Sequence, residues 1–207
     1  METFSLLRVL VVLCATTASL LAREPTSQDY DVWNAIVSHR NGSGATYVWH
    51  LVEPTSVFDR GQTKFALDFF PEARPVKKEW AAPAAELDLN KFAFAQTRTN
   101  QRSPFVAVIQ LLDEAKLAKA TGKSPRPIWL VSPKLIPGAD AIYRLSWPAY
   151  REDGRVAFLI CAVCTQWWGA IIEYEVNKDP FSGHWHQGRT ARRDITHWEN
   201  GELFNDE

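Results

Sequence analysis

The chain has 207 residues, 46% of them hydrophobic, and a formal net charge of −1 at neutral pH. This length suits one domain with a sizeable buried core, with room for at most a small appended lobe. The near-neutral charge argues against nucleic-acid binding, because that function requires a large basic surface to displace counterions from phosphates.

The first 22 residues have the pattern of a secretory signal peptide. Arg8 precedes an apolar stretch from Val9 to about Leu21, and a basic start followed by a short apolar core is typical of exported chains. Cleavage is expected after Ala22, with Ala18 as the alternative. The stretch is shorter than the roughly 20 residues of a membrane span. We therefore expect a secreted or periplasmic protein rather than an anchored one.

The N-terminal half predicts helices around one strand. Helical spacing of apolar residues indicates a helix from about Gln28 to His39, and strict alternation indicates a strand from Thr46 to Leu51. A second helix is expected from Ala84 to Gln96. The segment from Phe105 to Ala120 is interpreted as a strand to about Leu111 followed by a helix, with one amphipathic helix as the alternative. Ile128 to Val131 is a short strand candidate.

The C-terminal third predicts four strands joined by short turns. They are expected at Ile142–Trp147, Arg155–Val163, Gly169–Val176 and Gly183 to about Thr190. The turn before the second strand ends in Gly154, which can adopt a positive φ. Short turns imply antiparallel neighbours, since parallel pairing needs a crossover of a dozen or more residues.

Together these elements predict an α+β fold, with N-terminal helices packed on a C-terminal antiparallel β-meander. We expect a single domain over residues 23–198. The tail over residues 199–207 is acidic and poor in apolar residues, so it is expected to be mobile.

A series of motifs in the C-terminal region resembles that of a group of uncharacterised secreted bacterial proteins. The motifs are Leu145-Ser146-x-Pro148-x-Tyr150, Asp153-Gly154, the aliphatic strand from Ala157, Cys164, Gly169 and Gly183-His-Trp185. The resemblance covers about a third of the chain and implies export and a compact α+β domain. It implies no catalytic residue, because no activity is known for the group. The chain departs from the pattern at Trp168, where the group's second cysteine would fall.

Cys161 and Cys164 are the two cysteines outside the signal, and three outcomes are open for them. In one extended strand their Cα atoms would lie about 10 Å apart on opposite faces, too far for a disulfide. A turn at Ala162 and Val163 would allow a structural bridge, which makes the pair a disulfide candidate. A redox pair would need a helix to begin beside the first thiol, and the sequence after Cys164 does not predict one. The third outcome is two independent buried thiols.

His184 and His186 flank Trp185 in the last predicted strand, so both imidazoles are expected on one face. A structural zinc site needs four ligands, and His197 would add a third only if the chain folds back. We therefore expect no metal and no cofactor. His184 and His186 are candidate ligand-binding residues, and the simpler interpretation is that both face solvent.

Trp167 is the third candidate ligand-binding residue. The chain has nine tryptophans, and most of them alternate with polar residues as core residues do. Trp167 instead lies between two predicted strands, beside Thr165 and Gln166, whereas Trp168 is expected to pack beneath. A tryptophan in a loop offers a flat apolar face to sugars and other flat ligands.

The sequence contains no nucleophile elbow, zinc-protease pair or phosphate-binding glycine loop, so the common hydrolase and nucleotide classes lack their usual motifs. Arg189, Arg192 and Arg193 form a basic cluster that suits an anionic envelope partner or a solvated strand end. We expect an exported accessory or ligand-binding protein of the cell envelope. The alternative is an envelope hydrolase with a site assembled from distant residues such as Asp68 and Glu173.

Overall fold

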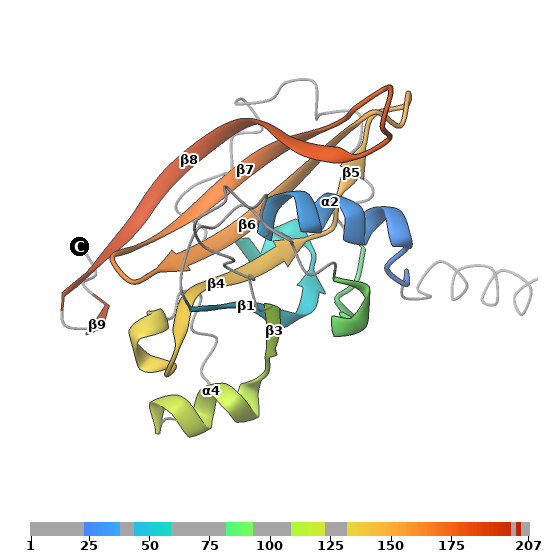
Figure 1. Cartoon of the computed structure of the whole chain (residues 1–207). Helices are drawn as coiled ribbons and strands as arrows, with labels where there is room; N and C mark the ends of the chain where they lie inside the picture. Colours follow the sequence, from blue (N-terminus) through green and yellow to red (C-terminus); the bar gives the residue numbers. More distant parts are fainter. Residues whose placement is uncertain are drawn as a thin grey trace, which may run out of the picture.

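The computed structural model describes residues 23–37, 44–58, 82–92, 109–122, 132–199 and 202–203. Their nine strands form a sheet with the order β2-β1-β4-β6-β7-β8-β9, in which β3 also pairs with β1 and β5 with β6 (Figure 1). The strands are β1 (Ala45–Glu53), β2 (Ala85–Glu86), β3 (Ile109–Leu112), β4 (Ala139–Ser146), β5 (Ala149–Tyr150), β6 (Val156–Thr165), β7 (Trp168–Lys178), β8 (Trp185–Glu199) and β9 (Glu202–Leu203).

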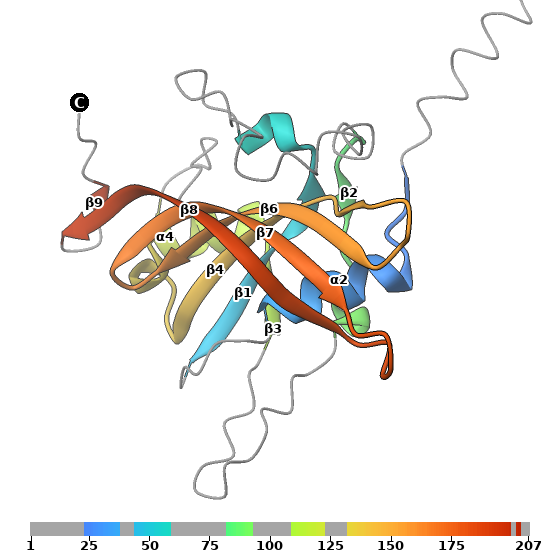
Figure 2. The same ribbon diagram turned by 90° about the horizontal axis from the view of Figure 1, so that it is seen from above.

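The helices of the described residues are short. Two are α-helices, α2 (Ser27–Val37) and α4 (Glu114–Thr121), and three are 3-10 turns, η2 (Thr55–Phe58), η4 (Leu89–Lys91) and η5 (Pro133–Leu135). Figures 1 and 2 show α2 lying across one face of the sheet, whereas α4 lies at the end of β3.

The predicted fold class, N-terminal helices packed on a C-terminal meander, is wrong. The described residues are mainly strand, and the N-terminal half supplies β1, β2 and β3 to the same sheet. Because β1 runs parallel to both β3 and β4, the sheet is mixed. The alternating pattern at Thr46–Leu51 identifies a strand, but it carries no information about which strands become its neighbours.

The C-terminal strands do follow the predicted antiparallel order. β6 pairs antiparallel with β4 and β7, and β7 pairs antiparallel with β8. The turn between β5 and β6 has Gly154 at φ 65°, and its N–H donates to the carbonyl of Arg151 at 2.8 Å. The predicted glycine turn is therefore confirmed.

Two of the N-terminal predictions are confirmed. Most of their predicted boundaries lie within one or two residues of the observed ones. The helix predicted from Gln28 is α2, and the strand predicted from Thr46 is β1. The strand-then-helix interpretation of the segment that ends at Ala120 is also confirmed over its described residues, as β3 and α4.

The helix predicted from Ala84 to Gln96 is wrong over its described residues. The N–H of Leu87 donates to the carbonyl of His50 at 2.9 Å, and the carboxylate of Asp88 accepts from the N–H of Asn90 at 2.9 Å. The first bond joins this segment to β1, and the second caps the single 3-10 turn η4 rather than an α-helix. Pairing with β1 therefore prevails over the helical spacing of the apolar residues.

A buried carboxylate fixes the start of α2. Asp29 accepts a hydrogen bond from the N–H of Thr26 at 2.8 Å, from Arg23 at 2.7 Å and from the hydroxyl of Tyr150 at 2.8 Å. The last bond ties the helix to β5. A buried charge is tolerated because it is fully paired, and here it orients α2 against the sheet.

Each face of the sheet carries its own hydrophobic core. On the face covered by α2, called the α2 face, Trp33 packs into a cluster with Leu159 and Cys161. On the other, called the opposite face, Ile160 and Cys164 belong to a second cluster with side chains from η2 and α4 and with Ile136, which follows η5. All ten residues of β6 are buried, which explains its almost continuous apolar sequence.

Some predictions lie partly or wholly outside the described residues. The signal peptide over residues 1–22 and the short strand Ile128–Val131 lie outside them. Of the tail, Glu202–Leu203 forms β9 and pairs with the end of β8. In the described part of the chain, no helix has both the length and the apolar character needed to cross a membrane.

Candidate functional site

Trp167 lies in the two-residue turn between β6 and β7, and its side chain is 68% exposed. Thr165 holds this turn in shape, because its hydroxyl oxygen accepts from the N–H of Trp167 and of Trp168, both at 3.2 Å. The same hydroxyl donates to the carbonyl of Trp168 at 3.1 Å. Trp168 is half-buried and packs against the core. The predicted position of Trp167 in a turn between two strands is therefore confirmed, and its role in ligand binding stays a prediction.

One residue of η5, Lys134, lies beside Trp167. The Lys134 ammonium is 4.6 Å from the centroid of the Trp167 ring system, within the range of a cation–π interaction. The next residue, Leu135, is 40% exposed. Figures 1 and 2 both show η5, coloured yellow, beside the β6–β7 turn at one end of the sheet. We call Lys134 and Trp167 the indole platform.

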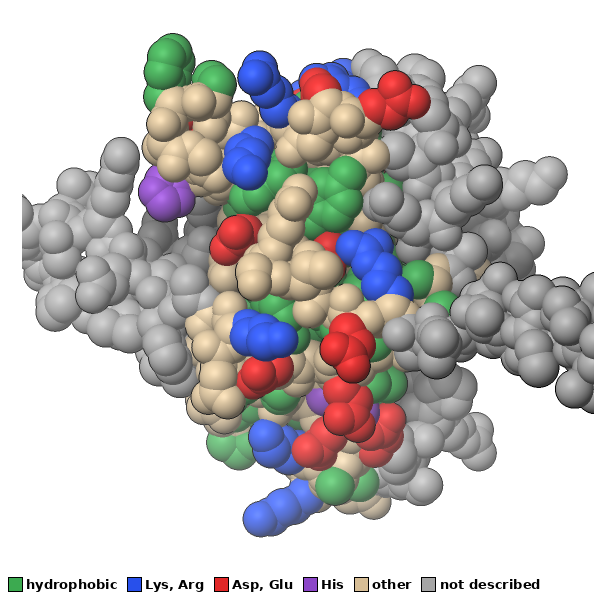
Figure 3. All heavy atoms as spheres, turned by 90° about the vertical axis from the view of Figure 1, so that its right-hand side faces the viewer, with side chains coloured by type: hydrophobic (Ala, Val, Ile, Leu, Met, Phe, Trp, Pro, Cys, Tyr) green, Lys and Arg blue, Asp and Glu red, His purple; other side chains and the backbone are tan. Residues whose placement is uncertain are grey.

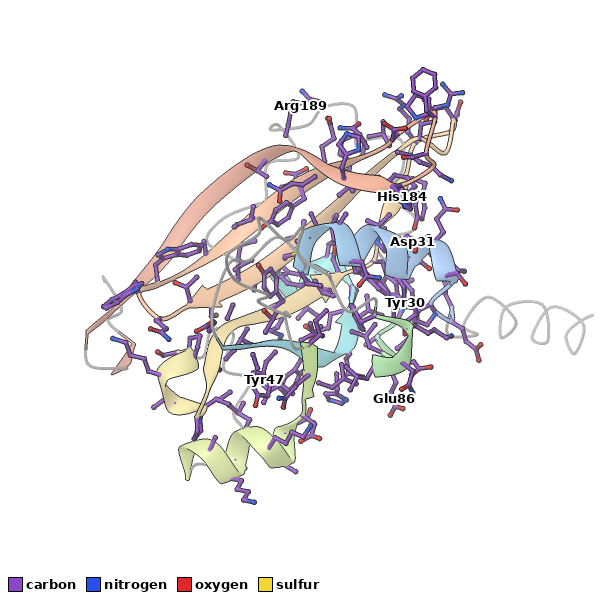
Figure 4. The ribbon with its side chains drawn as sticks, in the orientation of Figure 1. Tyr30, Asp31, Tyr47, Glu86, His184 and Arg189 are labelled. Carbon is purple, nitrogen blue, oxygen red and sulfur yellow. The ribbon has the colours of Figure 1, made fainter. Side chains whose placement is uncertain are left out.

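His184 and His186 are exposed near the hairpin that joins β7 and β8, where Figure 4 labels His184. β7 separates this hairpin from Trp167, and its 11 residues span roughly 35 Å at about 3.3 Å per residue. His184 and His186 therefore do not share a site with Trp167. Between them, Trp185 is buried and lies 5.9 Å from the ring of Tyr150.

The β7–β8 hairpin also carries Phe181, which the sequence analysis missed and which is 97% exposed. Asp179 fixes the hairpin, because its carboxylate accepts from the N–H of Ser182 at 2.7 Å and of Phe181 at 2.8 Å. These bonds lower the pKa of Asp179. No periodic signal in the sequence marks an exposed aromatic residue in such a turn.

Cys161 and Cys164 are both thiols rather than a disulfide. Both lie in β6, with Cys161 in the cluster on the α2 face and Cys164 in the cluster on the opposite face. This is the geometry expected for one extended strand. Burial raises the pKa of Cys161 far above its usual value, so this thiol is not poised for nucleophilic chemistry.

Two carboxylates on β7 have opposite environments. Glu173 and Glu175 are two residues apart and thus project from the same face, the one shared with Ile171. Glu173 is 2% exposed, and its Oε1 atom has no hydrogen-bond partner among the described residues. Desolvation raises the pKa of Glu173 to about 7.

Burial alone would also raise the pKa of Glu175, but hydrogen bonds outweigh it and hold the pKa below its usual value. The donors are Arg189 and, at 3.1 Å, the amide of Asn177. Environments that separate the pKa values of two acids are typical of acid–base pairs in enzymes. The simpler interpretation is that Glu175 forms a structural ion pair with Arg189. The near-complete burial of Glu173 restricts the access of a substrate to the Glu173 carboxyl group.

Two further polar contacts join neighbouring elements of the fold. Arg144 on β4 donates to Glu53 on β1 at 2.8 Å and lies 5.2 Å from the Trp49 ring. His50 Nε2 lies 3.0 Å from a carboxylate oxygen of Glu114 on α4, outside hydrogen-bond geometry. These contacts stabilise neighbouring elements rather than forming a reactive centre.

Arg189, from the predicted basic cluster, pairs with Glu175, and Figure 4 labels it along β8. Arg192 and Arg193 also belong to β8, but the structure does not describe their side chains. The described part of the face in Figure 3 shows both acidic and basic side chains, with acidic side chains adjoining one another in its lower part. Among the residues that the structure places, no group of three or more His, Cys, Asp or Glu side chains could hold a metal ion.

Comparison with protein-family models, with curated proteins and with solved structures finds no match to this chain. The resemblance to secreted bacterial proteins therefore stays a hypothesis, and the function must be argued from the described residues.

Proposed function

We propose that this protein is an exported, non-enzymatic binding protein of the cell envelope that holds its ligand at the indole platform. The observation that carries the proposal is the 68% exposure of Trp167 on a turn held by the Thr165 hydroxyl. An indole held in place before binding loses little conformational entropy when a flat ligand stacks on it. Most other described tryptophans are buried or half-buried.

Export is the second part of the proposal, and the residues that support it are the basic start and apolar stretch that end at Ala22. The full chain, expressed with a C-terminal tag in a bacterial host, should appear in the periplasm or medium and be shorter by the predicted 22 residues. N-terminal sequencing would read Arg23 first. A full-length product in the cytoplasm would contradict export.

The binding proposal is tested by co-sedimentation with insoluble cell-wall material. The wild-type protein should pellet with the material, and Trp167→Ala should lose most of this binding, because the substitution removes the stacking surface. Phe181→Ala is the matched control, since it removes an even more exposed aromatic ring from the other end of the sheet. Equal pelleting of wild type and Trp167→Ala would refute the indole platform.

A second candidate function, an envelope hydrolase, is favoured by the Glu173 and Glu175 pair alone. In that function the protonated Glu173 would act as general acid and the ionised Glu175 as general base. The purified protein, incubated with cell-wall polysaccharide, would then release new reducing ends, and Glu173→Gln would abolish the release. The binding proposal predicts no release from either protein.

A further inference from the structure

We infer that the ligand of the indole platform is a sugar ring that carries a negative charge, and that Lys134 recognises this charge. The inference rests on the proposed function, because it specifies the chemistry of the ligand held at Trp167.

The first support is the position of the Lys134 ammonium. It lies 4.6 Å from the centroid of the Trp167 ring, so a ligand that stacks on the exposed indole is also within reach of this cation. The lysine side chain is long and flexible. It can therefore move from the ring to an anionic group at the edge of the indole without moving η5.

The second support is that Lys134 has no carboxylate within ion-pair distance among the described residues. Two arginines of the described sheet differ in this respect, since Arg144 and Arg189 each pair with a glutamate. A cation held beside an exposed ring, with no counterion in the described part of the chain, suits a ligand that supplies the anion, because charge-assisted hydrogen bonds are stronger than neutral ones.

The third support is the apolar surface of the platform. The described residues have three exposed large hydrophobic side chains, and one of them, Trp167, is the ring beside Lys134. A pyranose presents a flat face of C–H groups that fits such a surface, while its hydroxyls and its charged substituent face solvent and Lys134.

One cation beside one ring does not suit a polyanion backbone. A nucleic acid is held by several phosphate contacts, which need a basic surface, and the chain has a net charge of −1. The geometry instead suits a single acidic ring, such as a uronic acid or a sugar with a carboxylate-bearing side group.

The test compares two sugars that differ only in their charged group. N-acetylmuramic acid carries a lactyl carboxylate that N-acetylglucosamine lacks. Each is titrated into the purified protein, and binding is measured by calorimetry or by chemical-shift changes in the indole N–H region. The acidic sugar should bind about fivefold more tightly than the neutral one, the difference expected for one exposed charge contact. The preference should shrink at high salt.

Variants assign the preference to Lys134. Lys134→Gln should bind both sugars equally, at the affinity of the wild-type protein for the neutral sugar, and Lys134→Arg should restore the preference for the acidic sugar. Phe181→Ala should behave as wild type.

The outcomes separate the two proposals. If both sugars bind equally to the wild-type protein and both are lost in Trp167→Ala, the platform binds sugars but the charge inference is wrong. A preference that survives Lys134→Gln also overturns the inference. If neither sugar binds and cell-wall material does not sediment the protein, the proposed function itself fails.

Discussion

At the scale of single residues, Glu173 and Cys161 have surroundings that change their chemistry most. Both lie in the interior strands of the sheet and both are buried, and burial raises the pKa of each group because it disfavours the charged form. A buried acid that ionises only in the unfolded state weakens the fold as the pH rises.

This effect gives a prediction for pH and stability. The pKa of Glu173 is about 7 in the folded protein, compared with 4.5 for an unperturbed glutamate. Between these values the unfolded chain loses a proton that the folded chain keeps, so stability falls as the pH rises from about 4.5 to 7. The contribution reaches up to about 3 kcal/mol. Below pH 4.5 it is absent, because both states are protonated.

Glu173→Gln should remove this pH-dependent loss, because the amide has a similar shape and does not ionise. Urea unfolding of both proteins at pH 4.5 and pH 7.5 measures it. The variant should gain stability relative to wild type at pH 7.5 but not at pH 4.5. An unchanged difference between the proteins across this range would contradict the raised pKa.

A second prediction concerns the thiols. Cys161 and Cys164 should both react with a thiol reagent in denaturant without any reductant, because they lie on opposite faces of one strand. In the native protein neither should react quickly, since both are buried. Two thiols that appear only after reduction would show a disulfide instead.

At the scale of elements, the sequence predicts best where local signals and tertiary pairing agree. Glycine and acidic residues mark the turn before β6, and the aliphatic run of β6 matches a strand buried on both faces. The segment from Ala84 shows the opposite case, because its helical spacing is overridden by the bond from Leu87 to His50. No local pattern encodes a partner 37 positions away.

The residues of the candidate site also differ in how far the sequence predicts them. Trp167 could be predicted, because polar neighbours between two strands indicate an exposed turn. Lys134 could not, because it reaches the ring only through the packing of η5 beside the β6–β7 turn. The pair of Glu173 and Glu175 could be seen in the alternation of β7, but their different ionisation depends on Arg189 from the next strand.

The β5–β6 turn gives a prediction at this scale. Gly154 adopts φ 65°, and a Cβ atom there would meet nothing within 4 Å. Gly154→Ala should therefore destabilise the protein through backbone strain alone, by about 1 kcal/mol. Chemical denaturation measures the change. Glu152→Ala in the same exposed turn is the control and should change stability by less than about 0.5 kcal/mol. Equal effects of the two substitutions would contradict the turn geometry.

At the scale of the whole molecule, the two ends of the sheet carry different exposed side chains. One end carries the indole platform, and the other carries the β7–β8 hairpin with Phe181 and the two exposed histidines. The core on each face fixes the strands between them. Sequence reasoning missed this arrangement because β1 enters the sheet beside β4, and parallel pairing between such distant strands leaves no local pattern.

The most direct test of the proposed binding site is a two-dimensional NMR titration of indole N–H groups. The nine tryptophans give nine indole signals, and the signal missing from Trp167→Phe identifies Trp167. On addition of soluble cell-wall fragments, that signal should show the largest shift, and the signals of the buried tryptophans should stay in place. If the Trp167 signal does not move while another indole signal does, the ligand binds elsewhere and the account is wrong.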